Sequence, residues 1–175
     1  KIAITADWII GGGSERVLYE LHKMYPDAPI YTTYCSEEWR AKLDNKVVTG
    51  YLQHLGKIRK FLPLLQQWWF KSLNFTGYDI VISCTGNGQD KSITKPTGTT
   101  HISYCYTPVH YFWRHFALYI KNPGFGLFDP FARLGLKLLV GPLRKADYKA
   151  AQQVDYFIGI SNHIKADIKK YYNRK

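Results

Sequence analysis

Short β-branched and apolar segments alternate with helix-forming segments along almost the whole chain of 175 residues. The first unit is a predicted strand at residues 2–6, a glycine cluster, and then apolar residues at helical spacing from Val17 to Tyr25. Five further strands are predicted at residues 28–34, 46–49, 78–84, 101–105 and 155–160. Strands separated by helices favour right-handed crossovers and a parallel sheet. The sequence therefore predicts an α/β fold, a Rossmann-like and mostly parallel sheet with helices on both faces.

Length and composition indicate one compact domain over residues 1–175. Apolar residues make up 46% and aromatic residues 16% of the chain, which is too rich for a disordered protein. No run of 18 apolar residues occurs, so no transmembrane helix is expected. Cys35, Cys84 and Cys105 lie far apart, which excludes a zinc ribbon, argues against a disulfide framework and favours a reducing compartment.

The net charge of +11 predicts an anionic partner. Nucleic acid is the least favoured of the anionic partners, because the chain carries no RNP-like or helix-turn-helix pattern. The only adjacent acidic pair is Glu37 and Glu38, and the histidines lack metal-ligand spacing. We therefore expect no metal site and no cofactor.

Ligands of such sheets bind beyond the carboxyl ends of the strands, which here precede residues 7–14, 85–91 and 106–113 and Ser161. Gly12, Gly13 and Ser14 lie between the first strand and the first helix, where backbone N–H groups and the helix dipole suit phosphate. A simple tight turn explains these glycines equally well. The aromatic segment 103–114 is, by composition, more typical of sheet packing than of a site. Ser161 is a predicted N-cap of the last helix.

A resemblance rests on the order of several segments. They are Ala6-Asp7, Gly12-Gly13-Ser14-Glu15-Arg16-Val17-Leu18, Tyr25-Pro26-Asp27-Ala28-Pro29-Ile30-Tyr31-Thr32, Tyr78-Asp79-Ile80-Val81-Ile82-Ser83, His101-Ile102-Ser103-Tyr104-Cys105-Tyr106-Thr107-Pro108 and Val154-Asp155-Tyr156-Phe157-Ile158. Together with Ser161 they resemble the amino-terminal domain of family 4 glycosyltransferases of the GT-B fold, from residue 1 to about residue 172. The resemblance implies retaining, metal-independent transfer of a sugar from a nucleotide-diphosphate donor to a glycan or lipid-linked acceptor.

The resemblance also implies roles for individual residues. It puts Gly12, Gly13 and Ser14 beside the donor diphosphate. Tyr106 replaces the usual histidine and is expected to donate a hydrogen bond rather than transfer a proton. His110 stands where relatives often have arginine and partly substitutes for the missing imidazole. The expected substrate contacts also include Lys91, Thr107 and Ser161; for Lys91, which matches a lysine common in similar sequences, the competing interpretation is an ordinary solvated side chain.

The donor domain of the family carries two glutamates eight positions apart, and this chain has no such pair. We therefore expect residues 1–175 to be the acceptor-side half of the enzyme, without the donor domain and inactive alone. The expected function is cell-surface polysaccharide synthesis at the cytoplasmic face of the membrane. The alternative is a non-catalytic glycan-binding or lipid-binding module derived from such an enzyme.

Residues 57–71 are predicted to form an interfacial helix with an apolar face of Phe61, Leu64, Leu65, Trp68 and Trp69. The flanking cations are Lys57, Arg59, Lys60 and Lys71, which suit an anionic membrane surface. The competing interpretation is that these aromatic residues pack on the sheet.

Overall fold

The structure is a computed structural model that describes residues 1–55, 62–86, 88–124 and 126–175. Its strands are β1 (Ile2–Ile9), β2 (Ile30–Cys35), β3 (Val47–Thr49), β4 (Ile80–Thr85), β5 (Thr100–Cys105) and β6 (Tyr156–Gly159). Its helices are α1 (Gly13–Met24), α2 (Glu37–Lys42), α3 (Pro63–Ser72), α4 (Phe116–Lys121), the 3₁₀ helix η2 (Gly126–Phe128), α5 (Asp129–Gln152) and α6 (Asn162–Tyr172).

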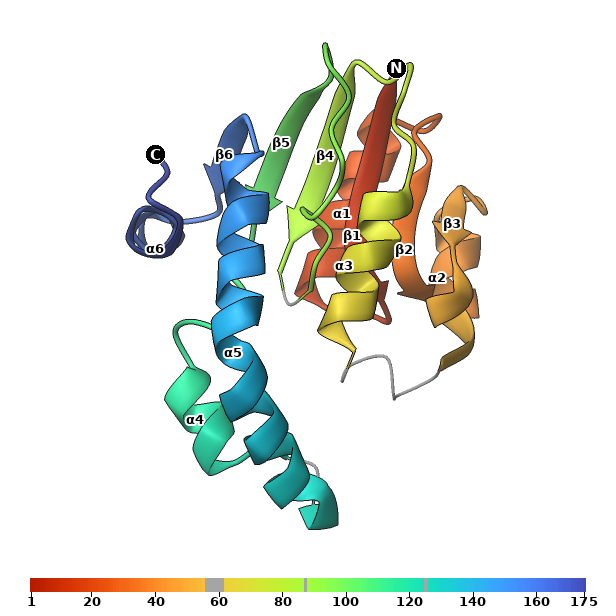
Figure 1. Ribbon diagram of the computed structural model, residues 1–175. Coiled ribbons are helices and arrows are strands. Elements are labelled where there is room, and N and C mark those ends of the chain that lie inside the picture. Colours follow the sequence, from red (N-terminus) through yellow and green to blue (C-terminus); the bar gives the residue numbers. More distant parts are fainter. Residues whose placement is uncertain (56–61, 87, 125) are drawn as a thin grey trace.

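The six strands form one parallel sheet in the order β3-β2-β1-β4-β5-β6 (Figure 1). This Rossmann-like arrangement confirms the predicted fold class, and each strand lies close to its predicted place. The largest difference is β1, which runs to Ile9 instead of residue 6. Trp8 and Ile9 extend the ladder because they pair with Tyr34 and Cys35 of β2. Asp7 is therefore a strand residue, and the loop in which we predicted a ligand begins after Ile9.

Helices cover both faces of the sheet, with α3 in front of it and α1 behind it in Figure 1. Successive strand residues point to opposite faces. Ile4 packs with Leu18 of α1, whereas its neighbour Ala3 packs with Trp69 and Phe70 of α3. The central strands β1 and β4 are largely buried on both faces, and their buried hydroxyl residues Thr5, Ser83 and Thr85 form hydrogen bonds within the protein.

The carboxyl-terminal half of α5 packs beside β5 and α6, where Ala151, Cys105 and Ile168 share one cluster. Ser161 caps α6, because its hydroxyl oxygen accepts a hydrogen bond of 3.3 Å from the Ile164 amide. This confirms the N-cap predicted from the sequence. Together α5 and α6 close the β6 side of the domain.

Beyond the carboxyl edge of the sheet, α4, η2 and the first half of α5 extend away from the body of the domain (Figure 1). We call residues 116–124 and 126–142 the projection. The buried residues of α5 begin only at Leu143, directly after Gly141 and Pro142. No helix within the described ranges is both long and apolar enough to cross a membrane.

Candidate functional site

The carboxyl ends of β1, β4 and β5 surround a small cavity of about 120 Å³. Its walls are Ala6, Asp7, Trp8, Ile9, Ser14, Glu15, Leu18, Cys84, Gly86, Tyr106 and Thr107. The glycine loop and the segment that starts at Tyr106 are thus brought together, although 92 positions separate Ser14 from Tyr106. This is the edge at which parallel α/β sheets bind ligands.

The glycine loop is held by a carboxylate of its own. Glu15 is buried, and its Oε1 atom accepts hydrogen bonds from the amides of Ile10 at 3.1 Å and Gly11 at 3.2 Å. The hydroxyl of Ser14 donates to its Oε2 atom at 2.7 Å. Gly12, Gly13 and Ser14 are exposed at the start of α1, as a phosphate-binding loop requires. An anion bound there would, however, lie close to the negative charge of Glu15.

Tyr106 links the end of β5 to this loop, because its hydroxyl donates a 3.2 Å hydrogen bond to the Ser14 carbonyl. Burial, reinforced by the nearby Cys84, raises the pKa of Tyr106 above its usual range. The hydroxyl therefore remains protonated near neutral pH and acts as a hydrogen-bond donor. The expected role of Tyr106, in which it positions the reacting groups without transferring a proton, remains a prediction.

Two carboxyl groups that are distant in sequence meet beneath the cavity. Asp7 of β1 and Asp90 of the segment after β4 are both buried, and each affects the pKa of the other. Gly88 permits the approach, since a Cβ atom there would lie 1.9 Å from the Oδ1 atom of Asp7. Burial raises the pKa of Asp90 to about 6, and burial together with Asp90 raises that of Asp7. The sequence showed only Glu37 and Glu38 as an acidic pair, and so missed this one.

Lys91 does not face the cavity edge as a free cation. Its side chain has no exposed surface, and its Nζ atom lies 2.5 Å from the Oδ1 atom of Asp147 in α5. Trp113 and Tyr172 both donate to the other oxygen of Asp147, at 2.7 and 2.9 Å. The expectation that Lys91 contacts an anionic ligand, and the alternative of a solvated lysine, both conflict with this burial. In the structure Asp147 instead connects Lys91, Trp113 and Tyr172 to α5.

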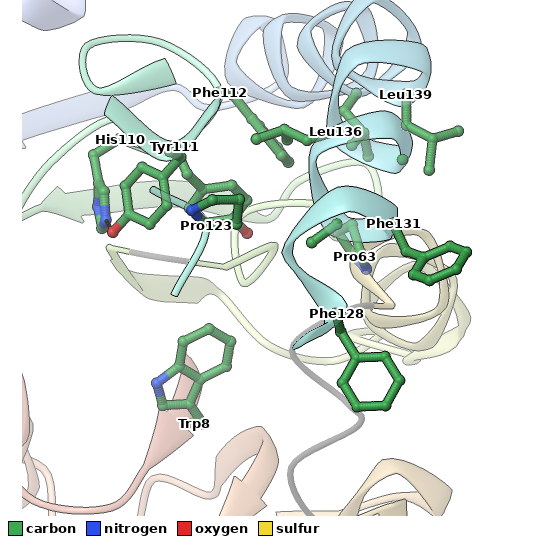
Figure 2. Close-up of a pocket in the computed structure, with 14 residues that line it drawn as sticks. Trp8, Pro63, His110, Tyr111, Phe112, Pro123, Phe128, Phe131, Leu136 and Leu139 are labelled. Carbon is green, nitrogen blue, oxygen red and sulfur yellow. Dashed lines mark hydrogen bonds between the residues drawn. The ribbon is translucent and has the colours of Figure 1, made fainter. Parts of the chain in front are cut away.

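A second and much larger hollow of about 720 Å³ separates the sheet edge from the projection (Figure 2). Its lining is almost entirely apolar: Trp8, Pro63, His110, Tyr111, Phe112, Tyr119, Pro123, Phe128, Phe131, Ala132, Gly135, Leu136, Leu139 and Leu143. We call it the groove. Its size and lining are typical of small-molecule sites. The aromatic segment 103–114 packs in the core, as its composition favoured, since Val109 and Phe112 are buried against Leu143. Three of its residues, His110, Tyr111 and Phe112, also line this hollow.

His110 supplies one of the few polar groups in the groove. Its Nε2 atom lies 2.8 Å from the hydroxyl of Tyr119. Burial lowers the pKa of His110, and the neighbouring His115 lowers it further. The imidazole is therefore neutral at physiological pH and can exchange a hydrogen bond with a ligand hydroxyl.

Trp8 borders both hollows. In Figure 2 its ring stands between the end of β1 and the α5 side of the groove. The small polar cavity and the groove are therefore neighbours that share one wall.

Two other expected site residues serve the local fold in this structure. The Thr107 hydroxyl donates to the Pro108 carbonyl at 2.8 Å, although Thr107 also lines the small cavity. The Ser161 side chain is the cap of α6. Their expected contacts with substrate remain predictions.

The predicted interfacial helix begins later than expected, since α3 starts at Pro63. Its two tryptophans point in different directions: Trp69 is buried against the sheet, whereas Trp68 is 67% exposed. Lys71 is exposed. The single apolar face that we predicted is therefore divided between core and solvent. Lys57, Arg59, Lys60 and Phe61 lie outside the described residues.

Metal-binding groups do not gather in the part of the chain that the structure describes: no three His, Cys, Asp or Glu side chains there are placed to share an ion. Comparison with protein-family models, with curated proteins and with solved structures finds no match to this chain. The geometry of the site and the sequence resemblance therefore remain as indications of function.

Proposed function

We propose that this chain is the acceptor-binding domain of a retaining, metal-independent glycosyltransferase. The enzyme moves a sugar from a nucleotide-sugar donor to a glycan or lipid-linked acceptor in cell-surface polysaccharide synthesis. It works at the cytoplasmic face of the membrane as a peripheral protein. The chain binds the acceptor and contributes one wall of the cleft, and the donor is held with the help of a second domain.

The observation that carries the proposal is the shared wall at Trp8. A small cavity that holds a helix start and a hydroxyl donor lies directly beside a much larger apolar groove. An amphiphile has the matching chemistry, because its chain needs an apolar channel and its polar head needs hydrogen bonds. Of the two acceptor classes, the groove therefore favours the lipid-linked one.

The polar half of the site supports binding of the sugar and the diphosphate. Gly12, Gly13 and Ser14 present the start of α1, where backbone amides suit phosphate oxygens. Protonated Tyr106 in the small cavity, and neutral His110 on the neighbouring wall of the groove, offer hydrogen bonds to sugar hydroxyls without adding charge. In this proposal both residues position the reacting groups.

The first test is a transfer assay on the complete gene product, with labelled nucleotide sugars as donors and membrane lipid extract as acceptor. Tyr106→Phe removes the hydrogen bond to Ser14 and lowers turnover roughly tenfold, while the pH profile gains no new titration near neutrality. Tyr104→Phe, two residues earlier and within β5, is the matched control. Absence of transfer with any donor, combined with glycan or lipid binding, would favour the alternative of a non-catalytic module.

The second test concerns the groove alone and uses residues 1–175. Gly135 lines the groove, and a Cβ atom there meets nothing within 4 Å, so Gly135→Leu fills the groove without removing a contact. Gly141→Leu is the control, because Gly141 has the same free space on α5 but does not line the groove. We expect dodecyl phosphate to bind the parent chain and the control at least about tenfold more tightly than Gly135→Leu. Equal binding by all three proteins contradicts a lipid-linked acceptor.

A further inference from the structure

The projection exposes large apolar side chains that no described part of the domain covers. Leu127 is 95% exposed, and Phe131 is 74% exposed. Phe131, Leu134 and Leu138 follow the spacing i, i+3 and i+7, which aligns them along one side of α5. Phe128 extends this surface at the tip of the projection. We call these five residues the apolar stripe. Contiguous exposed apolar surface of this kind marks an interaction site.

The apolar stripe is not the outer face of a core helix. The core residues of α5 begin at Leu143, whereas the stripe lies in the half of the helix that reaches beyond the sheet (Figure 1). The opposite side of the same half faces the groove through Leu136 and Leu139. This half of α5 is therefore apolar on two sides, and only one of these sides faces the domain.

The positive charges around the apolar stripe indicate which kind of partner it binds. Lys121 and Lys137 are exposed within the projection, and exposed Lys145 follows Leu138 by seven positions on the same side of α5. From residue 116 to residue 146 the sequence contains one acidic residue, Asp129. A second copy of this chain would bring the same positive charges to the contact and be repelled. Apolar side chains between cations instead match an anionic lipid surface, where side chains enter the headgroup boundary and lysines meet phosphate.

We infer that the projection docks the protein on an anionic lipid bilayer, with the apolar stripe inserted and Lys121, Lys137 and Lys145 at the headgroups. The proposed peripheral protein then contacts the membrane through the projection. This surface is distinct from the sequence-predicted helix at residues 57–71. Phe128 and Phe131 belong to the stripe and also line the groove. The groove therefore borders the membrane contact, so that a lipid-linked ligand enters it from the bilayer side.

The test is cosedimentation of residues 1–175 with vesicles of phosphatidylcholine alone, or with about one third phosphatidylglycerol. We expect binding to the anionic vesicles only, weakened by salt. Leu127→Gln/Leu134→Gln/Leu138→Gln should reduce the bound fraction roughly tenfold, and none of the three leucines lines the groove. Met24→Gln in α1 and Trp68→Gln in α3 are controls with similarly exposed apolar side chains, and both should bind like the parent.

A second measurement reports insertion directly. Cys35, Cys84 and Cys105 are buried, so a polarity-sensitive thiol dye reacts selectively with Leu134→Cys. Its emission should shift to the blue when anionic vesicles are added. The inference is overturned if the folded chain fails to bind anionic vesicles, or if Trp68→Gln abolishes binding and the triple variant does not. It is also overturned if sedimentation shows a dimer that the triple variant dissociates. The groove test is independent of these outcomes, because dodecyl phosphate binding requires no vesicle.

Discussion

Lys91 and Asp147 are 56 positions apart in the sequence and form an ion pair in which neither side chain has exposed surface. Burial alone lowers the pKa of Lys91, but the carboxylates of Asp147 and Asp90 outweigh this effect and raise it. The ring of Tyr172 lies 5.3 Å from the ammonium group. The pair therefore fastens α5, and with it the base of the projection, to the segment after β4.

Removal of one partner should be costly, because it leaves the other charge buried without compensation. Lys91→Met is expected to lower the free energy of unfolding by about 3–5 kcal/mol. Lys95→Met is the matched control, since the Lys95–Asp155 pair is partly exposed and is worth about 1 kcal/mol or less. Urea denaturation of both variants measures the difference. Similar losses of unfolding free energy in the two variants would contradict the large cost expected for breaking the buried Lys91–Asp147 pair.

The buried acid pair predicts a stability that decreases as pH rises. The pKa of Asp90 is raised to about 6, against about 3.9 in an unfolded chain. Between these values the folded state retains a proton that the unfolded state has lost, so rising pH favours unfolding. Asp90→Asn should therefore gain stability relative to the parent as pH rises from 4 to 6, with a slope of at most about 1.4 kcal/mol per pH unit. Denaturant titrations at several pH values test this, and a constant difference between the proteins contradicts it.

Burial of His101 predicts the opposite dependence of stability on pH, over a pH range that overlaps the range for Asp90. Burial lowers its pKa to about 3, against about 6.5 in an unfolded chain, and its Nε2 atom lies 3.0 Å from the Ser83 hydroxyl. The neutral, buried imidazole stabilises the fold fully above pH 6.5. This stabilisation is lost as the pH falls from about 6.5 towards about 3. His101→Gln should thus gain stability relative to the parent on acidification, by at most about 1.4 kcal/mol per pH unit. NMR titration of the imidazole is the direct check: a midpoint near 6.5 in the folded protein would refute the prediction.

Glu15 should restrain anion binding at the glycine loop, because its carboxylate already accepts the Ile10 and Gly11 amides. Glu15→Gln removes the charge but keeps an oxygen for these hydrogen bonds. We expect pyrophosphate to bind the variant about three to ten times more tightly. Glu20→Gln, an exposed position of the same helix, is the control. In NMR titrations the amides of Gly12, Gly13 and Ser14 should shift first, and a response confined to other amides argues against an anion site here.

The sequence by itself determined the local elements and their class. Six strands, the first and last helices and the cap at Ser161 are visible in it, because side-chain periodicity and capping depend on neighbouring residues. The parallel sheet follows from the alternation of strands and helices. These features also located the carboxyl edge of the sheet and the glycine loop on it. The end of β1 was misjudged, because its extension to Ile9 depends on pairing with β2.

Only the tertiary structure decided which side chains meet. Asp7 and Asp90 form a pair because β1 and β4 are neighbours in the sheet, although 83 positions separate them. Lys91 has the local sequence of a surface lysine, and its burial depends on α5 returning past β4. The stripe and the groove arise because α5 continues beyond the edge of the sheet. Periodicity shows that a helix has an apolar face. The elements that pack on this face come from distant parts of the chain, and their placement depends on the packing of the whole fold.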